Sequence, residues 1–153
     1  MQLLWIIFLS AVPVLEQKAA IPMALALGYP EVTAYVATLI GALIPAPFII
    51  LFLPMVFDFL RKFEKLGKLV DRYEANAMKR GKNIVKYELI GLFMFVAIPL
   101  PLTGVWTGSA VAAFLKLDFK KAFPTVILGA AACGLIIMFV AKGLFSLPWI
   151  HLG

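Results

Sequence analysis

Two charged side chains, Glu16 and Lys18, stand within a mostly apolar stretch that runs from Leu3 to Gly28. A charge at the centre of a membrane costs about 2.5 to 3.5 kcal/mol on insertion scales, so such residues must be paired, protonated or in contact with water. A carboxylic acid at this depth can bind and release a proton during a transport cycle. We therefore expect Glu16 and Lys18 to bind substrate or couple protons, and a purely structural ion pair is the alternative.

A second apolar stretch, from Tyr87 to Leu115, is interrupted at residues 99–108, which read PLPLTGVWTG. Its prolines free backbone carbonyls, and a helix that starts around Thr103 to Trp106 would point its N-terminus at the interruption, where phosphate or carboxylate is favoured. For Trp106, stacking on a substrate and packing between the interruptions are both open. The candidate binding residues, besides Glu16 and Lys18, are Pro22, Pro99, Pro101, Thr103, Gly104, Trp106, Thr107 and Gly108.

The composition of the chain excludes a soluble domain. Apolar residues make up 63% of its 153 residues, charged residues only 14%, and the mean hydropathy is +1.01. These values predict an integral membrane protein. The net charge is +6, but most Lys and Arg residues lie between Arg61 and Lys86, where they orient the protein and attract anionic lipid. We therefore expect membrane lipids as partners and no nucleic acid.

Residues that could support an enzyme or a metal site are scarce. Cys133 is the single cysteine and His151 the single histidine. No clustered acids and no nucleophile beside a base are apparent, so we expect no catalytic activity, no cofactor and no metal.

Two uninterrupted apolar segments, 32–57 and 122–141, each follow an interrupted one. Segment 32–57 would be about 39 Å long as a helix, against about 30 Å of hydrocarbon, so it should tilt or kink at its prolines. The arms of the interrupted stretches, 3–14 and 87–98, would each be about 18 Å long and reach roughly the middle of the membrane. The prolines that predict the kink are Pro45, Pro47 and Pro54.

Charge placement predicts how the second interrupted stretch enters the membrane. Lysines and arginines precede it and follow it, which puts both of its ends in the cytoplasm and favours a re-entrant hairpin. For the first stretch, a hairpin from outside and a full crossing both fit the charges, and we prefer the hairpin because it makes the two halves equivalent. The flanking charges are Lys79, Arg80, Lys82 and Lys86 before the stretch, and Lys116, Lys120 and Lys121 after it.

Together these features predict an all-α integral membrane protein with two re-entrant helical hairpins and two transmembrane helices as an inverted repeat. The single membrane domain, 1–153, would divide into a first repeat at 1–58, a basic amphipathic cytoplasmic segment at 59–83 and a second repeat at 84–145. When the two halves of the sequence are aligned so that Gly41 matches Gly129, their small-residue patches coincide. Apolar residues spaced by three and four from Phe59 to Ala77 predict a helix on the cytoplasmic surface.

Residues 13–22, which read PVLEQKAAIP, and residues 99–108 resemble the motifs of the small multidrug export family of bacterial and archaeal membrane proteins. That family is itself similar to the DedA/VTT superfamily, which has paired re-entrant hairpins. Lys18 stands where the family usually has arginine. The resemblance implies a multi-pass protein of the cell membrane that moves drug-like or lipid-phosphate substrates with proton coupling.

The sequence therefore predicts a small DedA-like transporter or lipid translocase. One alternative is a four-span proton/drug antiporter, in which residues 87–115 cross the membrane fully and one embedded glutamate serves a dimer. Another is a non-transporting membrane scaffold. A homodimer is expected in any case, because four short elements can hardly seal a cavity alone.

Overall fold

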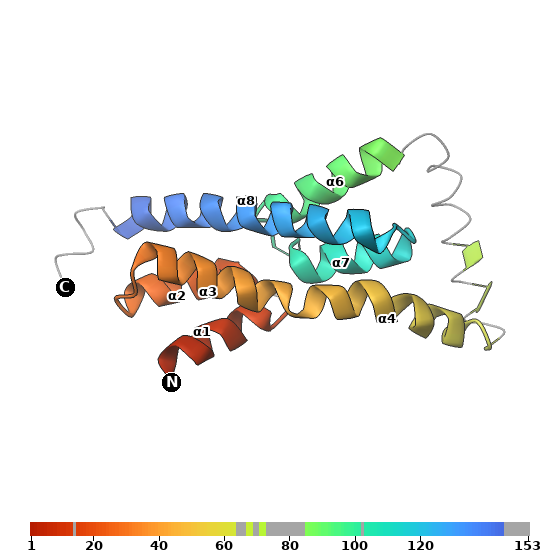
Figure 1. Ribbon diagram of the computed structural model, residues 1–153, viewed down its shortest axis with the longest axis horizontal. Helices are drawn as coiled ribbons and strands as arrows, with labels where there is room; N and C mark the ends of the chain where they lie inside the picture. Colours follow the sequence, from red (N-terminus) through yellow and green to blue (C-terminus); the bar gives the residue numbers. More distant parts are fainter. Residues whose placement is uncertain (14, 64–66, 69–70, 73–84, 102, 146–153) are drawn as a thin grey trace.

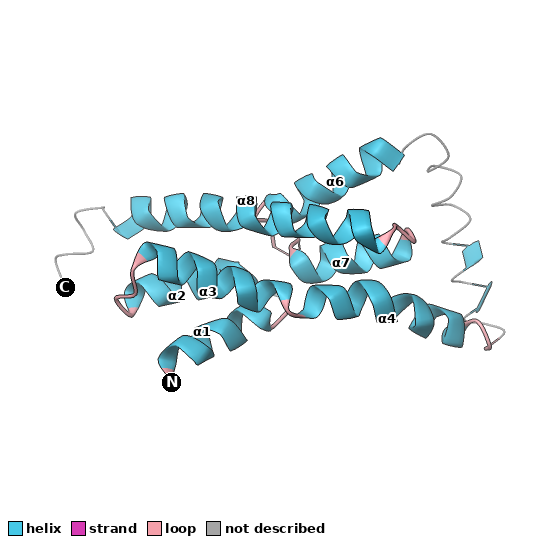
Figure 2. Ribbon diagram, viewed as in Figure 1, coloured by secondary structure: helices cyan, strands magenta, loops and turns pink. Residues whose placement is uncertain are grey.

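A computed structural model of the chain describes residues 1–13, 15–63, 67–68, 71–72, 85–101 and 103–145. Over these residues the chain is helical and contains no strand (Figure 2), which confirms the predicted all-α class. Figure 1 labels the helices α1 (Gln2–Ala11), α2 (Glu16–Ala26), α3 (Glu31–Leu43), α4 (Pro45–Leu60), α6 (Val85–Ala97), α7 (Val105–Phe114) and α8 (Phe119–Phe145).

Within the described residues, two helical segments are long and apolar enough to cross a membrane: Glu31–Leu60, which joins α3 and α4 over 30 residues, and Phe119–Gly143 in α8, over 25. At about 1.5 Å per residue they measure about 45 Å and 37 Å, more than the hydrocarbon core requires. α3 ends at Leu43 and α4 begins at Pro45, because proline cannot donate the next helical hydrogen bond. Of the three prolines at which the sequence predicts a kink, Pro45 marks a break between two helices, whereas Pro47 and Pro54 lie inside α4.

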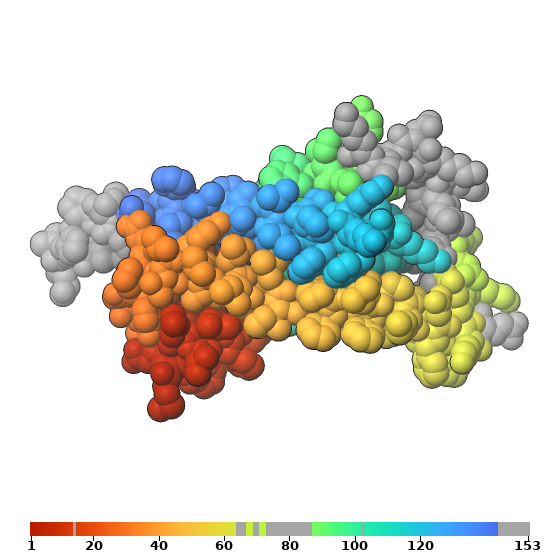
Figure 3. Space-filling model, in the orientation of Figure 1, coloured from red at the N-terminus to blue at the C-terminus, as the bar shows by residue number. Residues whose placement is uncertain are grey.

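The remaining helices are short and form two pairs, α1 with α2 and α6 with α7. In Figure 1 each pair lies at its own end of the elongated molecule and turns back near the centre, and the N-terminal pair occupies one end of the space-filling view in Figure 3. The interruptions are narrower than the sequence predicts. Thr107 and Gly108 lie inside α7, and Pro22 lies inside α2. The missing N–H of Pro22 does not end α2, because neighbouring helices can support a helix at a proline.

Each pair builds a core against one end of α8. The core of α1 and α2 contains Ile6, Ile21 and Ala24 with Cys133 and Ile137 of α8. The core of α6 and α7 also packs on the end of α3, on α4 and on the first half of α8, and its buried members are Ala42, Ala46, Ile50, Leu92, Val96, Val105, Ala112, Ala122, Val126 and Ala130. Many of these residues are alanines, and small side chains let apolar helices approach closely.

Gly41 and Gly129 occupy matching contacts in the two halves. A Cβ atom on Gly41 of α3 would collide with the carbonyl of Ile7 in α1 and come 3.0 Å from Cβ of Ser10. On Gly129 of α8 it would come 3.1 Å from the carbonyl of Phe93 in α6 and 2.8 Å from Cβ of Val96. Gly41 thus lets α1 lie against α3, and Gly129 lets α6 lie against α8.

Buried positions recur in the same register. Position 129 lies 88 residues beyond position 41, and the same interval relates most buried residues of α2 to buried residues around the start of α7 and within it. The α2 set is Glu16, Gln17, Ala20, Ile21 and Ala24, and the corresponding residues are Gly104, Val105, Gly108, Ser109 and Ala112.

The predicted amphipathic helix is interrupted within the described residues. α4 ends at Leu60, and residues 61–63 form a turn instead of a continuous helix. Arg61 pairs with Asp58 at 3.0 Å and with Asp71 at 3.2 Å. These ion pairs hold the chain where it leaves α4. Most of the predicted stripe, including residues 73–84, lies outside the described residues.

Candidate site where the two helix pairs meet

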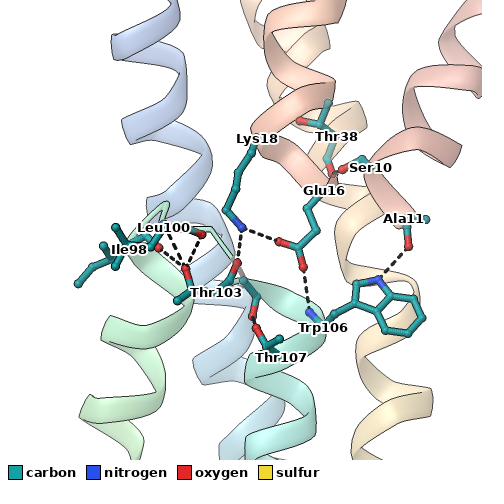
Figure 4. Close-up of polar contacts among 11 residues, drawn as sticks. Ser10, Ala11, Glu16, Lys18, Thr38, Ile98, Leu100, Thr103, Trp106 and Thr107 are labelled. Atoms are coloured by element: carbon teal, nitrogen blue, oxygen red, sulfur yellow. Dashed lines mark hydrogen bonds and ion pairs between the residues drawn. The ribbon is translucent and has the colours of Figure 1, made fainter. Parts of the chain in front are cut away.

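The turns of the two helix pairs meet at the centre of the molecule, where Glu16 and Lys18 face the segment from Thr103 to Trp106 (Figure 4). Glu16 is the first residue of α2 and is only 5% exposed. The sequence places these residues in two separate interruptions, and the structure brings them together.

Glu16 caps a helix that belongs to the other pair. Its Oε1 accepts a hydrogen bond from the backbone N–H of Trp106 at 3.0 Å, in the first turn of α7. The N-cap residue of α7, Gly104, has no side chain that could do this. Unpaired N–H groups and the helix dipole make that end a favourable place for a carboxylate. The predicted anion-binding helix start is therefore occupied by the protein's own acid.

Lys18 completes the charge pairing. Its Nζ lies 3.2 Å from Oε2 of Glu16 and also donates a hydrogen bond to the carbonyl of Thr103. Its side chain is 20% exposed, so the protein does not fully enclose the pair. Among the described residues no group of three His, Cys, Asp or Glu side chains could hold a metal ion. The centre thus contains one compensated pair of opposite charges.

Backbone geometry on both sides of this contact is unusual. Gly104 has φ 144° and ψ −160°, a conformation that is essentially restricted to glycine. A Cβ atom there would collide with the carboxylate of Glu16. Glu16 itself has φ 43°, in the left-handed region, which costs a non-glycine residue roughly 1 kcal/mol or more. The chain therefore accepts strain in order to place this carboxylate against Gly104.

Trp106 closes the contact from the opposite direction. Its indole Nε1–H donates to the carbonyl of Ala11 at 2.9 Å. Ala11 is the last residue of α1, where carbonyls lack helical partners. The ring thus lies between the two turns, and its stacking on a substrate stays a prediction. Each pair of helices therefore caps an end of a helix in the other.

The other predicted residues play more local parts. The hydroxyl of Thr103 lies 2.8 Å from the carbonyl of Ile98 and 3.0 Å from that of Leu100, so it holds the turn between α6 and α7 together. Gly108 provides room for Val96. Pro99 and Pro101 lie in the same turn, and Pro22 lies in the second half of α2. Of the predicted residues, Glu16, Lys18, Thr103, Gly104 and Trp106 form the contact.

Gln17 is a polar residue that the sequence prediction missed. It is 3% exposed, and its Nε2 has no hydrogen-bond partner among the described residues. A Cβ on Gly134 would lie 2.9 Å from this nitrogen and 2.9 Å from the ring of Tyr35. Cys133, also buried, lies beside Gly134 in α8. An amide between two charged residues of an apolar stretch was the signal that could have revealed it.

Comparisons with known proteins give one match. The family model described as small multi-drug export protein matches residues 16–136, a range that begins at Glu16 and includes the whole second turn. Neither the curated proteins nor the solved structures give a match.

Proposed function

Because the chain belongs to the small multi-drug export protein family, and is a membrane protein with two helices able to span, we propose that it is a proton-coupled transporter. In this proposal α1–α2 and α6–α7 are re-entrant hairpins that enter from opposite faces. Support comes from their lengths, since ten-residue helices such as α1 and α7 measure about 15 Å, half the hydrocarbon thickness.

An inverted repeat would explain the recurring contacts. Gly41 and Gly129 each receive a backbone carbonyl and a Cβ atom, of α1 and α6 respectively, and the buried faces of α2 and α7 share one register. In repeat-built transporters the substrate site lies near the membrane midplane, where broken helices from the two halves meet. The contact between Glu16 and the start of α7 has this location in the proposed arrangement.

The observation that carries the proposal is the part-buried Glu16–Lys18 pair, each member of which makes one hydrogen bond to the opposite helix pair. Protonation of Glu16 would remove its attraction for Lys18 and weaken its hydrogen bond from Trp106, because both are strongest with a charged carboxylate. Of these two interactions, the bond from Trp106 ties α2 to α7, whereas the ion pair lies within α2 and holds Lys18 beside the carbonyl of Thr103. Proton uptake would thus loosen the contact between the turns, which is the coupling that a proton-driven transporter needs.

A lipophilic cation is the substrate class that this chemistry favours, and drug export is the activity in the family description. Such a cation would compete with protons and with Lys18 for one carboxylate, so that binding of one releases the other. A lipid phosphate is a second candidate, supported by the ammonium of Lys18 beside the α7 N-terminus. In that case protonation of Glu16 would free Lys18 to bind the phosphate.

The proposal is tested with purified protein in liposomes under an imposed pH gradient, with ethidium as the cationic probe. We expect gradient-driven ethidium movement with the native chain and none with Glu16→Gln. The matched control is Glu31→Gln, because Glu31 is an exposed acid that pairs with Lys142 at 2.8 Å, away from the site. Equal flux in native protein and Glu16→Gln would overturn the role of the acid.

The same liposomes separate the remaining possibilities. Proton-linked flipping of a fluorescent lipid phosphate, without ethidium movement, would assign the translocase activity instead. A scaffold predicts no flux of either probe from folded native protein, and Glu16→Gln would then change only stability. The four-span antiporter also predicts loss of flux in Glu16→Gln, so membrane topology must distinguish it.

A further inference from the structure

A pocket of about 250 Å³ lies at the far end of the α6–α7 pair, where α7 turns into α8 beside the start of α6. It is separate from the central site, which lies at the opposite end of these two helices. Its charged lining residues are two acids, Glu88 and Asp118, and two bases, Lys116 and Lys121. The described part of the lining thus offers both signs of charge.

Lys116 has an unusual backbone at this pocket. α7 ends with hydrogen bonds from the N–H of Leu117 to the carbonyl of Ala112, at 3.0 Å, and from the N–H of Lys116 to that of Ala113, at 3.1 Å. This pattern is the Schellman ending, which places one residue in the left-handed region, usually a glycine. Lys116 occupies that position with φ 51°.

The first half of the chain ends its corresponding helix in the same way but with glycine. After α2, the N–H of Tyr29 bonds to the carbonyl of Ala24 at 3.1 Å, and Gly28 has φ 82°. Position 116 lies 88 residues beyond position 28, the interval that relates the buried faces. Gly28 shows that this helix ending forms without a side chain at the left-handed position. A lysine at the corresponding position therefore adds strain that the backbone does not require. Observed strain of this kind indicates a use for the side chain.

The rest of the lining places the pocket at the edge of the apolar region. Leu89, Leu115 and Leu117 supply its apolar wall. The neighbouring Tyr87 is largely exposed, and tyrosines are enriched where the membrane meets water. Charged groups of both signs thus lie next to an apolar wall at the depth expected for lipid head groups.

We propose that this pocket binds the head group of a phospholipid that carries a primary amine, of the phosphatidylethanolamine class. Lys116 and Lys121 take the phosphate, because ammonium groups form strong hydrogen bonds with phosphate oxygens. Glu88 and Asp118 take the ammonium of the head group, and the leucines contact the start of the acyl chains. The proposal concerns a binding site and holds whether or not the protein transports anything.

The test measures lipid retention by native mass spectrometry of the purified full chain in detergent. The probes are dioleoyl phosphatidylethanolamine, dioleoyl phosphatidylglycerol and soluble phosphoethanolamine. We expect preferential retention of the ethanolamine lipid, lowered about tenfold by Lys121→Ala or Glu88→Gln, which each remove one charge-assisted contact. Lys120→Ala is the matched control, because Lys120 is an adjacent exposed lysine outside the lining.

The variants separate this site from simple charge attraction. Equal losses in Lys120→Ala and Lys121→Ala would overturn the pocket as the binding site. Equal retention of the two lipids, with no effect of Glu88→Gln, would overturn the role of the amine. Binding of phosphoethanolamine as tightly as the lipid would assign the pocket to a soluble ligand and overturn the lipid proposal.

Lys116→Gly supplies an independent readout. It removes the side chain but relieves the left-handed strain, so we expect it to keep or raise the unfolding temperature in lipid-free detergent while lowering lipid retention. A purely structural lysine would instead leave retention unchanged, which would contradict the proposal.

Discussion

The carboxylate of Glu16 accepts a hydrogen bond from the backbone N–H of Trp106, which lies 90 residues further along the chain. An acid at the first residue of one helix thereby serves as the N-terminal cap of another helix, in a different pair. The side chain joins the two halves of the molecule directly. Any motion that separates the two turns must break this bond, and the predictions below measure how much the protein depends on it.

Gly104→Ala should abolish folding or lower stability strongly. The added Cβ collides with the Glu16 carboxylate, and an alanine backbone cannot adopt φ 144° without strain. Gly28→Ala is the control for strain alone, since φ there is 82° but no atom lies within 4 Å of the added Cβ. We expect a cost of about 1 to 2 kcal/mol for the control. Thermal unfolding in detergent measures both. Similar losses for the two variants would mean that the carboxylate moves aside freely.

Lys18→Met should destabilise the protein by about 3 kcal/mol, because it leaves Glu16 charged and without its ammonium partner. The double variant Glu16→Gln with Lys18→Met should be less unstable than Lys18→Met alone, since the neutral amide needs no counter-charge. A double-mutant cycle from chemical unfolding measures the coupling. Additive effects would contradict a direct interaction.

Gly41→Ala and Gly129→Ala should each cost about 1 to 3 kcal/mol, the usual range for overpacking. The added methyl group would push α1 away from α3 in one case and α6 away from α8 in the other. Gly91→Ala is the matched control in α6, because nothing lies within 4 Å of its Cβ, and its higher helix propensity should make it neutral or stabilising. If one half tolerates the change and the other does not, the two contacts are not equivalent.

Trp106→Phe should lower stability by about 1 kcal/mol, because it removes the indole hydrogen bond to the carbonyl of Ala11 and leaves that carbonyl unpaired. Unfolding by denaturant provides the measurement. Loss of flux without loss of stability would show that this ring contacts the substrate instead.

Sided labelling of single cysteines tests the proposed topology in a Cys133→Ala background. With an impermeant maleimide, we expect Asn76→Cys and Lys120→Cys to react only after the cells are permeabilised, and Glu31→Cys to react in intact cells. Both Lys120 and Glu31 are exposed. Reaction of Lys120→Cys from outside would mean that residues 87–115 cross the membrane, which favours the four-span antiporter.

Much of the architecture could be predicted because it depends on local composition. Uniformly apolar runs give the two long helices, and Pro45 marks the break between α3 and α4. Helix ends were less accurate, since α8 begins at Phe119 and not at Ala122, where the apolar run starts. The start of α8 is set by polar residues such as Asp118, whose Oδ1 accepts a hydrogen bond from the backbone N–H of Lys120 at 3.2 Å.

The candidate site was predicted as two sets of residues and not as a set of contacts. The free-energy cost of isolated charges in an apolar stretch is enough to predict that Glu16 pairs with Lys18. Nothing local reveals that Glu16 bonds to Trp106, or that Trp106 bonds to Ala11, because each contact depends on how two distant turns approach each other. Gln17 was missed for the same reason.

The single cysteine of the chain is buried in α8, next to Gly134, where the side chains of Gln17 and Tyr35 come together. A thiol reagent can reach Cys133 only if α2 or α3 moves away from α8. The native sequence therefore contains its own reporter of such an opening. If the proposed proton-coupled cycle operates, the rate at which this thiol reacts should change with pH and with a transported compound, without any introduced label.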